Sequence, residues 1–177
     1  GEDGFEVSIS KSDVRKFVEI LLNDPDVGLV GLGARDALRL EAGLCLYGQD
    51  LSKDVTPVEA SLSWVISKRR REEGNFPGFN IINEQLVNGI KKCRVGISPF
   101  GKAPARAGCE IFVNGDRKIG SITSGGYSPT LERPIAMGYV EEAFSKIGTE
   151  VLLSVRGKYL PAKVVDLPFV SPKYFRK

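Results

Sequence analysis

The sequence predicts an α+β fold, in which a short strand and several helices are followed by a small antiparallel β-barrel of six strands. Three observations support this prediction. An alternating apolar pattern passes directly into a helical pattern near the N-terminus, the composition changes between Lys68 and Gly89, and short strand-like segments then follow at near-regular spacing. We therefore expect two parts, residues 1–90 and residues 91–177, which meet where the composition changes.

The first predicted strand covers residues 5–9, where apolar and polar side chains alternate as in a strand with one buried face. A helix should follow at once, because Ser10 or Ser12 can cap it and Pro25 stops it. Its apolar residues recur at the spacing of one helical face, at Val14, Phe17, Val18 and Leu21. The chain begins without Met and has nothing before this strand to pair with it, so we expect a piece of a longer protein.

A second helix is expected over residues 34–41, with Gly43 ending it in the left-handed conformation that glycine adopts without strain. Thr56 begins another short helix, because a proline follows it in the first helical turn. Residues 63–67 then indicate a buried strand, in which Trp64 is expected to belong to the core rather than to a stacking platform.

The barrel is predicted from short apolar segments separated by turn residues. The segments are Arg94–Ile97, Glu110–Val113, Lys118–Thr123, Ile135–Val140, Glu150–Val155 and Lys158–Val165. Asn114 and Gly115 supply the pair of positive φ angles that a type I′ hairpin needs, and Arg156 with Gly157 offers a second hairpin. The Gly-rich segment 124–129 has the composition of an anion cradle, but we interpret it as a loop between strands.

Composition excludes several classes of function. Hydrophobic residues make up 42% and charged residues 27% of the 177 positions, which is typical of a globular protein. The absence of histidine removes the usual general base of a hydrolytic triad and the commonest metal ligand. The three cysteines are far apart, so neither a zinc site nor a disulfide framework is indicated, and we expect no metal.

Charge and hydropathy also bear on the partners. A net charge of +3 is too small to indicate nucleic acid, which needs a concentrated basic face. No apolar run approaches the roughly 20 residues that a membrane helix needs, so we expect no membrane partner. The densest basic cluster, Lys68–Arg71, is either solvated surface or a docking site for an acidic partner.

Three side chains are candidates for binding a ligand, and each also has a simpler structural interpretation. Glu6 alternates with apolar neighbours and fits an outward-facing, solvated acid. Arg35 lies near the start of a helix, where a cation opposes the dipole, so it either pairs with Asp36 or Asp3 or grips a planar acceptor. Tyr174 either folds back over a site or anchors the C-terminal tail.

Several segments together resemble the C-terminal half of the aminomethyltransferase of the glycine cleavage system, the T-protein, and they occur in the same order. The segments are Gly1–Glu6, Ala34–Gly43, Leu46–Gly48, Thr56–Glu59, Lys118–Gly125 and Ile135–Val140. The resemblance implies that residues 1–90 are the remnant of an α/β folate-binding domain and that the barrel is self-contained. It also implies transfer of a one-carbon unit from the aminomethyl-lipoyl arm of the H-protein to tetrahydrofolate, with release of ammonia.

The same resemblance implies roles for individual residues. Glu6 matches the acid that binds the pterin edge, where a carboxylate can accept two N–H bonds. Arg35 matches a folate-contacting arginine, and Tyr174 matches a C-terminal aromatic residue of the same pocket. The family's aspartate beside the reacting nitrogen lies in the N-terminal half, so we assign no catalytic residue here and expect the chain alone to be inactive. The missing N-terminal half is then a partner, together with the lipoylated H-protein.

Other interpretations stay open at this point. One is the related folate-binding module of a sarcosine- or dimethylglycine-oxidising flavoenzyme. Another is a non-enzymatic folate-binding protein of iron–sulfur maturation, in which a cysteine immediately precedes the tyrosine. This chain has Leu46 before Tyr47, and Cys45 is one position further away. A plain binding barrel is the simplest alternative. The resemblance implies the cytoplasm if the source is bacterial and the mitochondrial matrix if it is eukaryotic.

Overall fold

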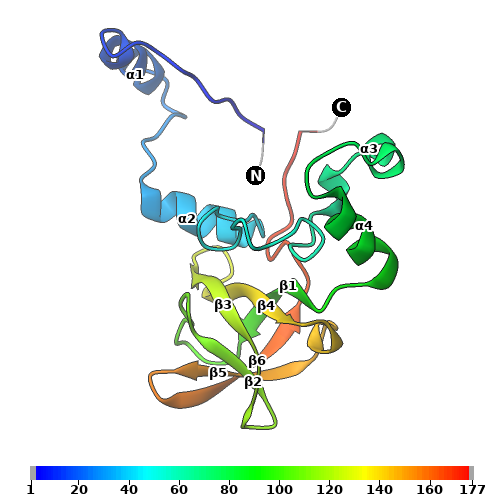
Figure 1. Cartoon of the computed structure of the whole chain (residues 1–177). Coiled ribbons are helices and arrows are strands. Elements are labelled where there is room, and N and C mark those ends of the chain that lie inside the picture. The colour runs from blue at the N-terminus through cyan, green and yellow to red at the C-terminus, as the bar shows by residue number, and fades with distance from the viewer. Residues whose placement is uncertain (1–2, 176–177) are drawn as a thin grey trace.

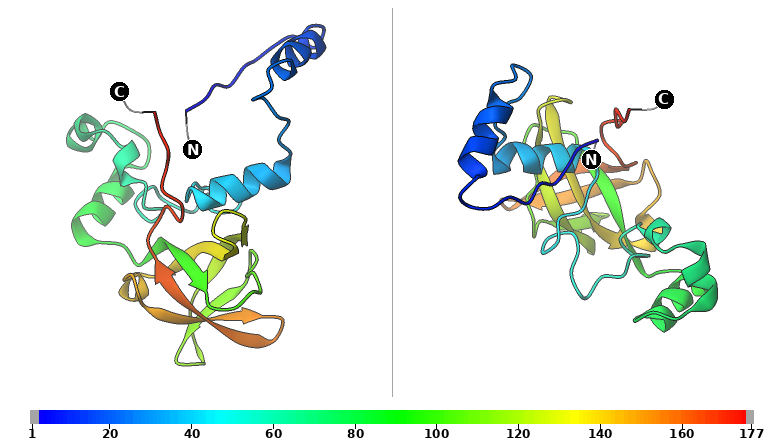
Figure 2. Two further views of the ribbon diagram at one scale, coloured as in Figure 1. Left: turned by 180° about the vertical axis from the view of Figure 1, so that it is seen from behind. Right: turned by 90° about the horizontal axis from the view of Figure 1, so that it is seen from above.

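The computed structural model describes residues 3–175, with a helical part placed over one end of a β-barrel (Figure 1). The helices are α1 (Val14–Leu22), α2 (Leu32–Glu41), α3 (Lys68–Glu73) and α4 (Phe79–Asn88), with a short 3-10 helix η1 (Ser63–Val65). Of these, α2 packs on the barrel strands β3 and β4 described below. Figure 2 shows α1 on one side of the molecule and the pair α3 and α4 on the other.

The barrel confirms the predicted fold class. Its strands form a closed antiparallel sheet in the order β1-β4-β3-β2-β5-β6. They are β1 (Lys92–Pro99), β2 (Glu110–Val113), β3 (Arg117–Ser128), β4 (Arg133–Glu141), β5 (Glu150–Val155) and β6 (Lys158–Val165), with a 3-10 helix η2 (Glu142–Phe144) after β4. Closure leaves no strand edge exposed in this sheet.

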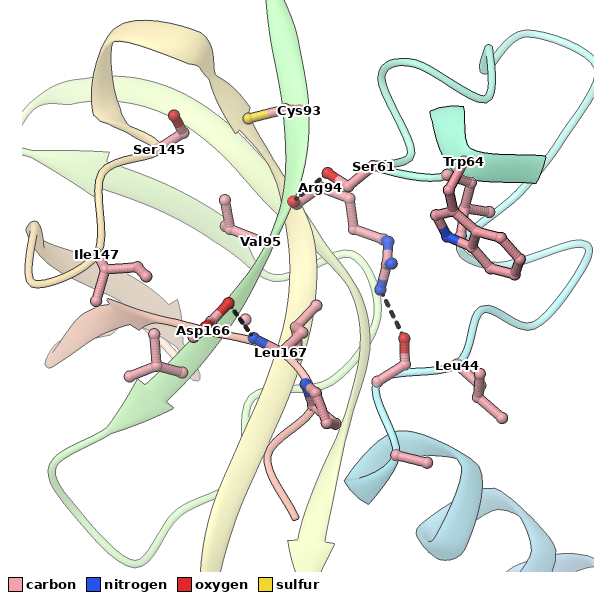
Figure 3. A pocket seen from close by; sticks show the side chains of 16 residues that line it. Leu44, Ser61, Trp64, Cys93, Arg94, Val95, Ser145, Ile147, Asp166 and Leu167 are labelled. Atoms are coloured by element: carbon pink, nitrogen blue, oxygen red, sulfur yellow. Dashed lines mark hydrogen bonds between the residues drawn. The ribbon is translucent and has the colours of Figure 1, made fainter. Parts of the chain in front are cut away.

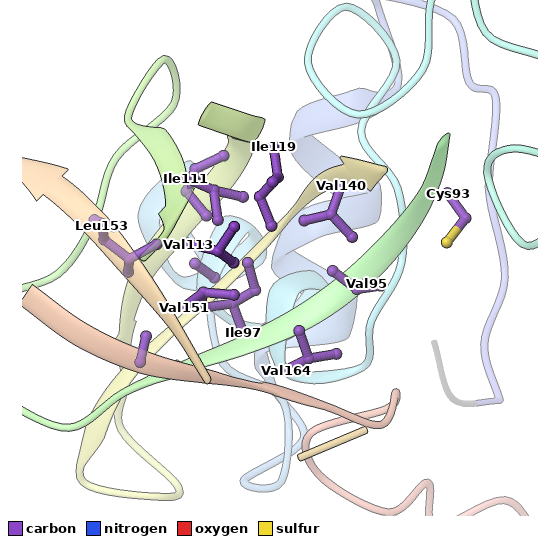
Figure 4. Packing of buried hydrophobic residues seen from close by; sticks show 14 residues of the cluster. Cys93, Val95, Ile97, Ile111, Val113, Ile119, Val140, Val151, Leu153 and Val164 are labelled. Atoms are coloured by element: carbon purple, nitrogen blue, oxygen red, sulfur yellow. The ribbon is translucent and has the colours of Figure 1, made fainter. Parts of the chain in front are cut away.

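Two apolar clusters hold the fold together. The first fills the barrel with β-branched and leucine side chains, among them Ile97, Ile111 and Leu153, which are fully buried (Figure 4). The second consists of Leu40, Ile135 and Met137, with Leu131, Leu167 and Phe169 packed against them. Because Leu40 belongs to α2 and Phe169 to the C-terminal segment, this second cluster fastens both to the barrel.

Both predicted hairpins are confirmed. Asn114 and Gly115 have the predicted positive φ angles, 54° and 86°, but Val113 pairs with Arg117, so the loop of this hairpin has three residues rather than the two of a type I′ turn. Arg156 and Gly157 have φ angles of 51° and 76°, so an arginine occupies the first loop position, which asparagine takes in the first hairpin.

The two predicted helices are present as α1 and α2, although α2 begins two residues earlier than expected, at Leu32. The predicted cap is wrong, because the N-cap of α1 is Asp13, without a side-chain cap bond, and not Ser10 or Ser12. Gly43 has a φ of 66°, and its N–H donates to Leu40 O at 3.0 Å while Leu44 N donates to Arg39 O at 2.9 Å. These two bonds form a Schellman cap at the end of α2. At Thr56 the predicted helix is a single turn, closed by Ala60 N donating to Thr56 O at 3.0 Å.

Two predicted strands are wrong. Residues 5–9 are extended and exposed, and no strand pairs with them among the described residues, so no ladder forms. Residues 63–67 form η1 and its exit, and Trp64 is 74% exposed rather than part of the core. A short apolar run does not by itself distinguish a strand from a helical turn. Here the hydrogen-bonded turns that begin at Thr56 lead directly into the helical turn η1. The helices α3 and α4 were not predicted.

The interpretation of residues 124–129 as a loop is also wrong, because residues 124–128 continue β3 and pair with β4. A Cβ atom at Gly125 would lie 1.9 Å from the carbonyl oxygen of Ala105. Glycine is therefore present here for a close approach between backbones rather than for a turn.

No helix among residues 3–175 is long and apolar enough to cross a membrane.

Candidate functional site

A cavity of about 450 Å³ opens between α2 and the segment that follows it. Its walls are mostly apolar, with two arginines and one thiol among them. The lining residues are Val30, Arg35, Leu38, Arg39, Leu44, Cys45 and Leu46. Apolar walls with a few polar groups are typical of small-molecule sites.

The Arg35 guanidinium lies on the wall of this cavity and forms no hydrogen bond or ion pair with any residue from 3 to 175. The acids that were expected to neutralise it are engaged elsewhere. Asp36 pairs with Arg39 at 2.7 Å, and Asp3 accepts a hydrogen bond from Phe175 N at 2.7 Å. The guanidinium thus keeps its donors for another acceptor, and its planar fork suits a carboxylate or amide group.

Two other lining residues, Arg39 and Leu46, are held in place by the Asp50 carboxylate, which is completely buried. It accepts hydrogen bonds from Arg39 Nη1 at 2.6 Å and from Leu46 N at 2.9 Å. Two hydroxyl groups of β3 also donate to it, Thr123 Oγ1 at 2.5 Å and Ser124 Oγ at 2.8 Å. A buried charge is tolerated when it is paired and fully bonded in this way. The network ties α2, the cavity wall and the barrel into one unit.

Burial around this network keeps two further groups protonated. Tyr139 donates its hydroxyl to the backbone carbonyl of Asp50 at 2.8 Å, and burial raises the pKa of the phenol far above its ordinary value. Burial also raises the pKa of the Cys45 thiol, an effect that the charge of Arg94 only partly offsets. Cys45 is therefore a neutral lining group near pH 7 rather than a thiolate nucleophile.

Sequence reasoning missed the whole Asp50 network. Its members lie far apart in the chain, since Ser124 is 74 positions from Asp50 and 85 positions from Arg39, and it bonds to both. A weak local signal was present, because an aspartate four residues after Leu46 can accept that residue's N–H across a turn containing Gly48.

A second anchor lies at the end of α2. The Glu41 carboxylate accepts bonds from Ser128 Oγ and from the N–H and hydroxyl of Thr130, the last two at 3.0 and 2.8 Å. Burial alone would raise the pKa of Glu41, but these bonds outweigh it and lower the pKa below its ordinary value. The backbone oxygen of Glu41 accepts from Val170 N at 3.0 Å and so holds the C-terminal segment against α2.

The other two predicted site residues lie on the terminal segments. Glu6 is exposed in the extended N-terminal segment, and Tyr174 is 45% exposed in the C-terminal one. The two segments approach each other, since Phe175 N donates to Asp3, and Figure 1 shows them on the same side of α2. Neither Glu6 nor Tyr174 lines the cavity that contains Arg35. The structure therefore joins the segments that carry Glu6 and Tyr174 without bringing all three candidates into one cavity.

A neighbouring cavity of about 500 Å³ separates the barrel from the segment around Trp64 (Figure 3). Its central polar group is Arg94, which is buried and donates from Nε to Ala60 O and from Nη1 to Gly43 O, both at 2.9 Å. These bonds fasten the turns after α2 to β1. Because its donors serve backbone carbonyls, Arg94 is a structural cation rather than a candidate ligand group.

The basic cluster Lys68–Arg71 forms most of α3 and is partly neutralised within that helix. Lys68 pairs with Glu72 at 3.8 Å and Arg69 with Glu73 at 2.7 Å. Arg70 donates to the backbone of Asn75 at 2.8 Å. These exposed pairs favour the interpretation as solvated surface and leave only modest charge for docking.

Within residues 3–175 there is no group of three or more cysteine, aspartate or glutamate side chains that could hold a metal ion.

Comparisons with known proteins agree with this architecture of a helical part joined to a barrel. A family model described as the GCVT N-terminal domain matches residues 1–70, and one described as the glycine cleavage T-protein C-terminal barrel domain matches residues 92–171. Together they define a protein class that combines these two domains. The chain belongs to the glycine cleavage T-protein family.

Individual relatives support this assignment. The chain is 50% identical to "Aminomethyltransferase, mitochondrial" of Dictyostelium discoideum, over 98% of this chain and 45% of the relative. It is 47% identical to the protein of the same name from Pisum sativum, over 99% of this chain and 43% of that one. The crystal structure of glycine cleavage system aminomethyltransferase T from Bartonella henselae superposes with a TM-score of 0.89 at 46% identity, covering 93% of this chain and 46% of that one. The chain thus spans less than half the length of these relatives, and the alternative families are not favoured.

Proposed function

We propose that the chain is part of a tetrahydrofolate-dependent aminomethyltransferase. The complete enzyme takes the one-carbon unit of an aminomethyl group from the lipoyl arm of the H-protein, passes it to tetrahydrofolate and releases ammonia. The single observation that supports this proposal best is the Arg35 guanidinium, which lies on a cavity wall and has no partner among residues 3–175, in a chain whose relatives are named aminomethyltransferases.

The roles of the candidate residues follow from their chemistry. Arg35 would bind the folate through bidentate hydrogen bonds to a planar acceptor. Glu6 would accept N–H bonds from the guanidine-like edge of the pterin, and Tyr174 would cover the same ligand from the C-terminal segment. Such a site works by positioning a nucleophilic nitrogen and by electrostatic stabilisation, which is compatible with a chain that lacks histidine.

Two protein partners belong to this proposal. The lipoylated H-protein supplies the substrate arm, and the N-terminal half of the enzyme supplies the remaining active-site groups. Support for the second partner comes from α1, whose apolar stripe has no buried residue in this chain. Without that half the chain alone is expected to be inactive.

The compartment depends on the source organism. A eukaryotic protein would work in the mitochondrial matrix and a bacterial one in the cytoplasm. The relatives from Dictyostelium discoideum, Pisum sativum and Schizosaccharomyces pombe are named mitochondrial, which favours the matrix.

The test joins this chain to the N-terminal half of the Bartonella henselae relative and measures tetrahydrofolate binding by calorimetry. Arg35→Ala and Glu6→Ala should each raise the dissociation constant by about tenfold or more, the usual effect of losing a hydrogen bond to a charged group. Arg15→Ala serves as a matched control, because Arg15 is an exposed arginine of α1 with no assigned role. Unchanged affinity in both site variants would remove the residue assignment.

A further inference from the structure

A third cavity, of about 440 Å³, lies in the barrel between the segment that joins β1 to β2 and the β5–β6 hairpin. It shares no lining residue with the cavity around Arg35. Its walls combine small apolar side chains with two arginines and a cysteine, and they contain no acidic residue. The lining residues are Ala103, Pro104, Arg106, Ala107, Cys109, Ser154, Val155 and Arg156.

The first cation, Arg106, lies on a segment that hydrogen bonds join to the barrel. Ala105 beside it is completely buried, and Gly108 N donates to Ile122 O of β3 at 2.9 Å. Cys109 N closes a turn onto Arg106 O at 3.1 Å. The guanidinium itself uses Nη1 for the carbonyl of Gly125 at 3.1 Å, so its other N–H groups stay available.

The second cation, Arg156, occupies a strained position. Its φ of 51° lies in the left-handed region, which disfavours side chains other than those of glycine, asparagine and aspartate. In the β2–β3 hairpin the first loop residue also has a left-handed φ, and there it is Asn114, a residue that tolerates this conformation. Within residues 3–175, Arg156 forms no hydrogen bond or ion pair that would offset this strain. Backbone strain of this kind is found most often at functional sites, and here it occurs at the wall of a cavity.

Among the residues that line the cavity, no acid balances the two arginines. The nearest acid along the chain, Glu110, is paired with Lys118 at 2.6 Å and does not line the cavity. Both arginines are exposed, and because no carboxylate lines the cavity with them, they give it a positive charge that attracts an anion. Guanidinium groups also match the oxygens of phosphates and carboxylates in a bidentate manner.

We propose that this cavity is an anion-binding site, separate from the folate site, that takes a small metabolite bearing a phosphate or carboxylate group. The two arginines would hold the anionic group. The cavity volume lies within the usual range for small ligands, and the apolar walls at Pro104 and Val155 suit a carbon skeleton attached to that group. This inference does not depend on the proposed transferase activity.

The test uses the 177-residue chain with inorganic phosphate and citrate as probes, titrated by calorimetry at constant ionic strength against chloride. Arg156→Gly is the decisive variant, because glycine accepts the left-handed φ without strain. It should raise the melting temperature and at the same time weaken binding of the anion by about tenfold or more. Arg106→Gln should weaken binding to a similar extent. Arg133→Ala, which changes an exposed arginine of β4 outside the cavity, should leave the affinity unchanged.

Cys109 provides an independent readout, because this half-buried residue lines the same cavity and its thiol donates to Ser154 O at 3.2 Å. Bound phosphate or citrate should slow alkylation of Cys109, followed on its own peptide by mass spectrometry, and should not slow alkylation of Cys45. No binding of either probe, or equal binding by the wild-type chain, Arg156→Gly and Arg106→Gln, would overturn the proposal. Binding of an acidic peptide but of neither small anion would also overturn it.

Discussion

Exchange of Asp50 for asparagine tests whether the buried network fixes the candidate site. The substitution keeps the shape of the side chain but removes its charge. Arg39, whose side chain is only 13% exposed, then loses its buried counterion. The new amide group also points a donor toward the donors of Thr123 and Ser124, which can no longer all be satisfied.

The expected loss of stability is large. Removing one partner of a buried ion pair costs about 3–5 kcal/mol, and we expect the lower end of this range because Arg39 keeps its second ion pair, with the exposed Asp36. The matched control is Glu110→Gln, which removes one partner of the exposed pair between Glu110 and Lys118. An exposed pair of this kind contributes about 0–1 kcal/mol. The two substitutions make the same chemical change, a carboxylate to an amide, in the same chain and differ chiefly in burial.

Urea denaturation of the three proteins, followed by far-UV circular dichroism, measures this difference. Fluorescence of Trp64 is a poor probe because that side chain is already 74% exposed. We expect Asp50→Asn to lower the denaturation midpoint much more than Glu110→Gln does, with an unchanged slope. Equal midpoints in the two variants would refute the argument that the buried Asp50 network stabilises the wall of the cavity.

Three further predictions concern single features of the fold. Gly125→Ala should destabilise the chain by about 1–3 kcal/mol, because its Cβ would meet the Ala105 carbonyl, whereas Gly101→Ala, with no atom within 4 Å, should be nearly neutral by the same denaturation measurement. The pKa of Glu41 is lowered on folding, so its stabilising effect is present above its unfolded pKa and is lost as the pH falls through the folded value. The difference in unfolding free energy between wild type and Glu41→Gln should therefore shrink from pH 7 to pH 3, and a constant difference would contradict this reasoning. Exchanging Lys68–Arg71 for serine in the joined enzyme should raise the KM for H-protein at low salt only, and a KM that does not depend on salt would leave the cluster as solvated surface.

The barrel was largely predictable because its signals are local. The bounds expected for β2, β5 and β6 are those observed, since each strand adjoins a hairpin whose turn residues mark its end. Gly125 misled the prediction because its role depends on Ala105, which approaches from another segment. Trp64 was wrongly predicted to be buried, because an apolar run in the sequence does not show whether other elements will cover its side chains.

The candidate site was predictable only in part, because most of its contacts join segments that are far apart in the sequence. Arg35 drew attention as a cation at the unfavourable end of a helix, and its location on a cavity wall agrees with a binding role. The residue that holds that wall in place, Asp50, does so through hydrogen bonds to Thr123 and Ser124 of β3. These bonds cannot be predicted from the local sequence around Asp50. Glu6 and Tyr174 rest on the family resemblance, and their ligand contacts stay a proposal.

The most direct test of the proposed function is reconstitution of the transferase from two polypeptides. This chain and the N-terminal half of the Bartonella henselae relative are mixed with aminomethylated H-protein and tetrahydrofolate, and the formation of methylenetetrahydrofolate is measured. The account predicts transfer only when both halves are present, with no activity from either alone. Activity of this chain by itself, or a mixture that associates and binds tetrahydrofolate without transferring the one-carbon unit, would contradict it.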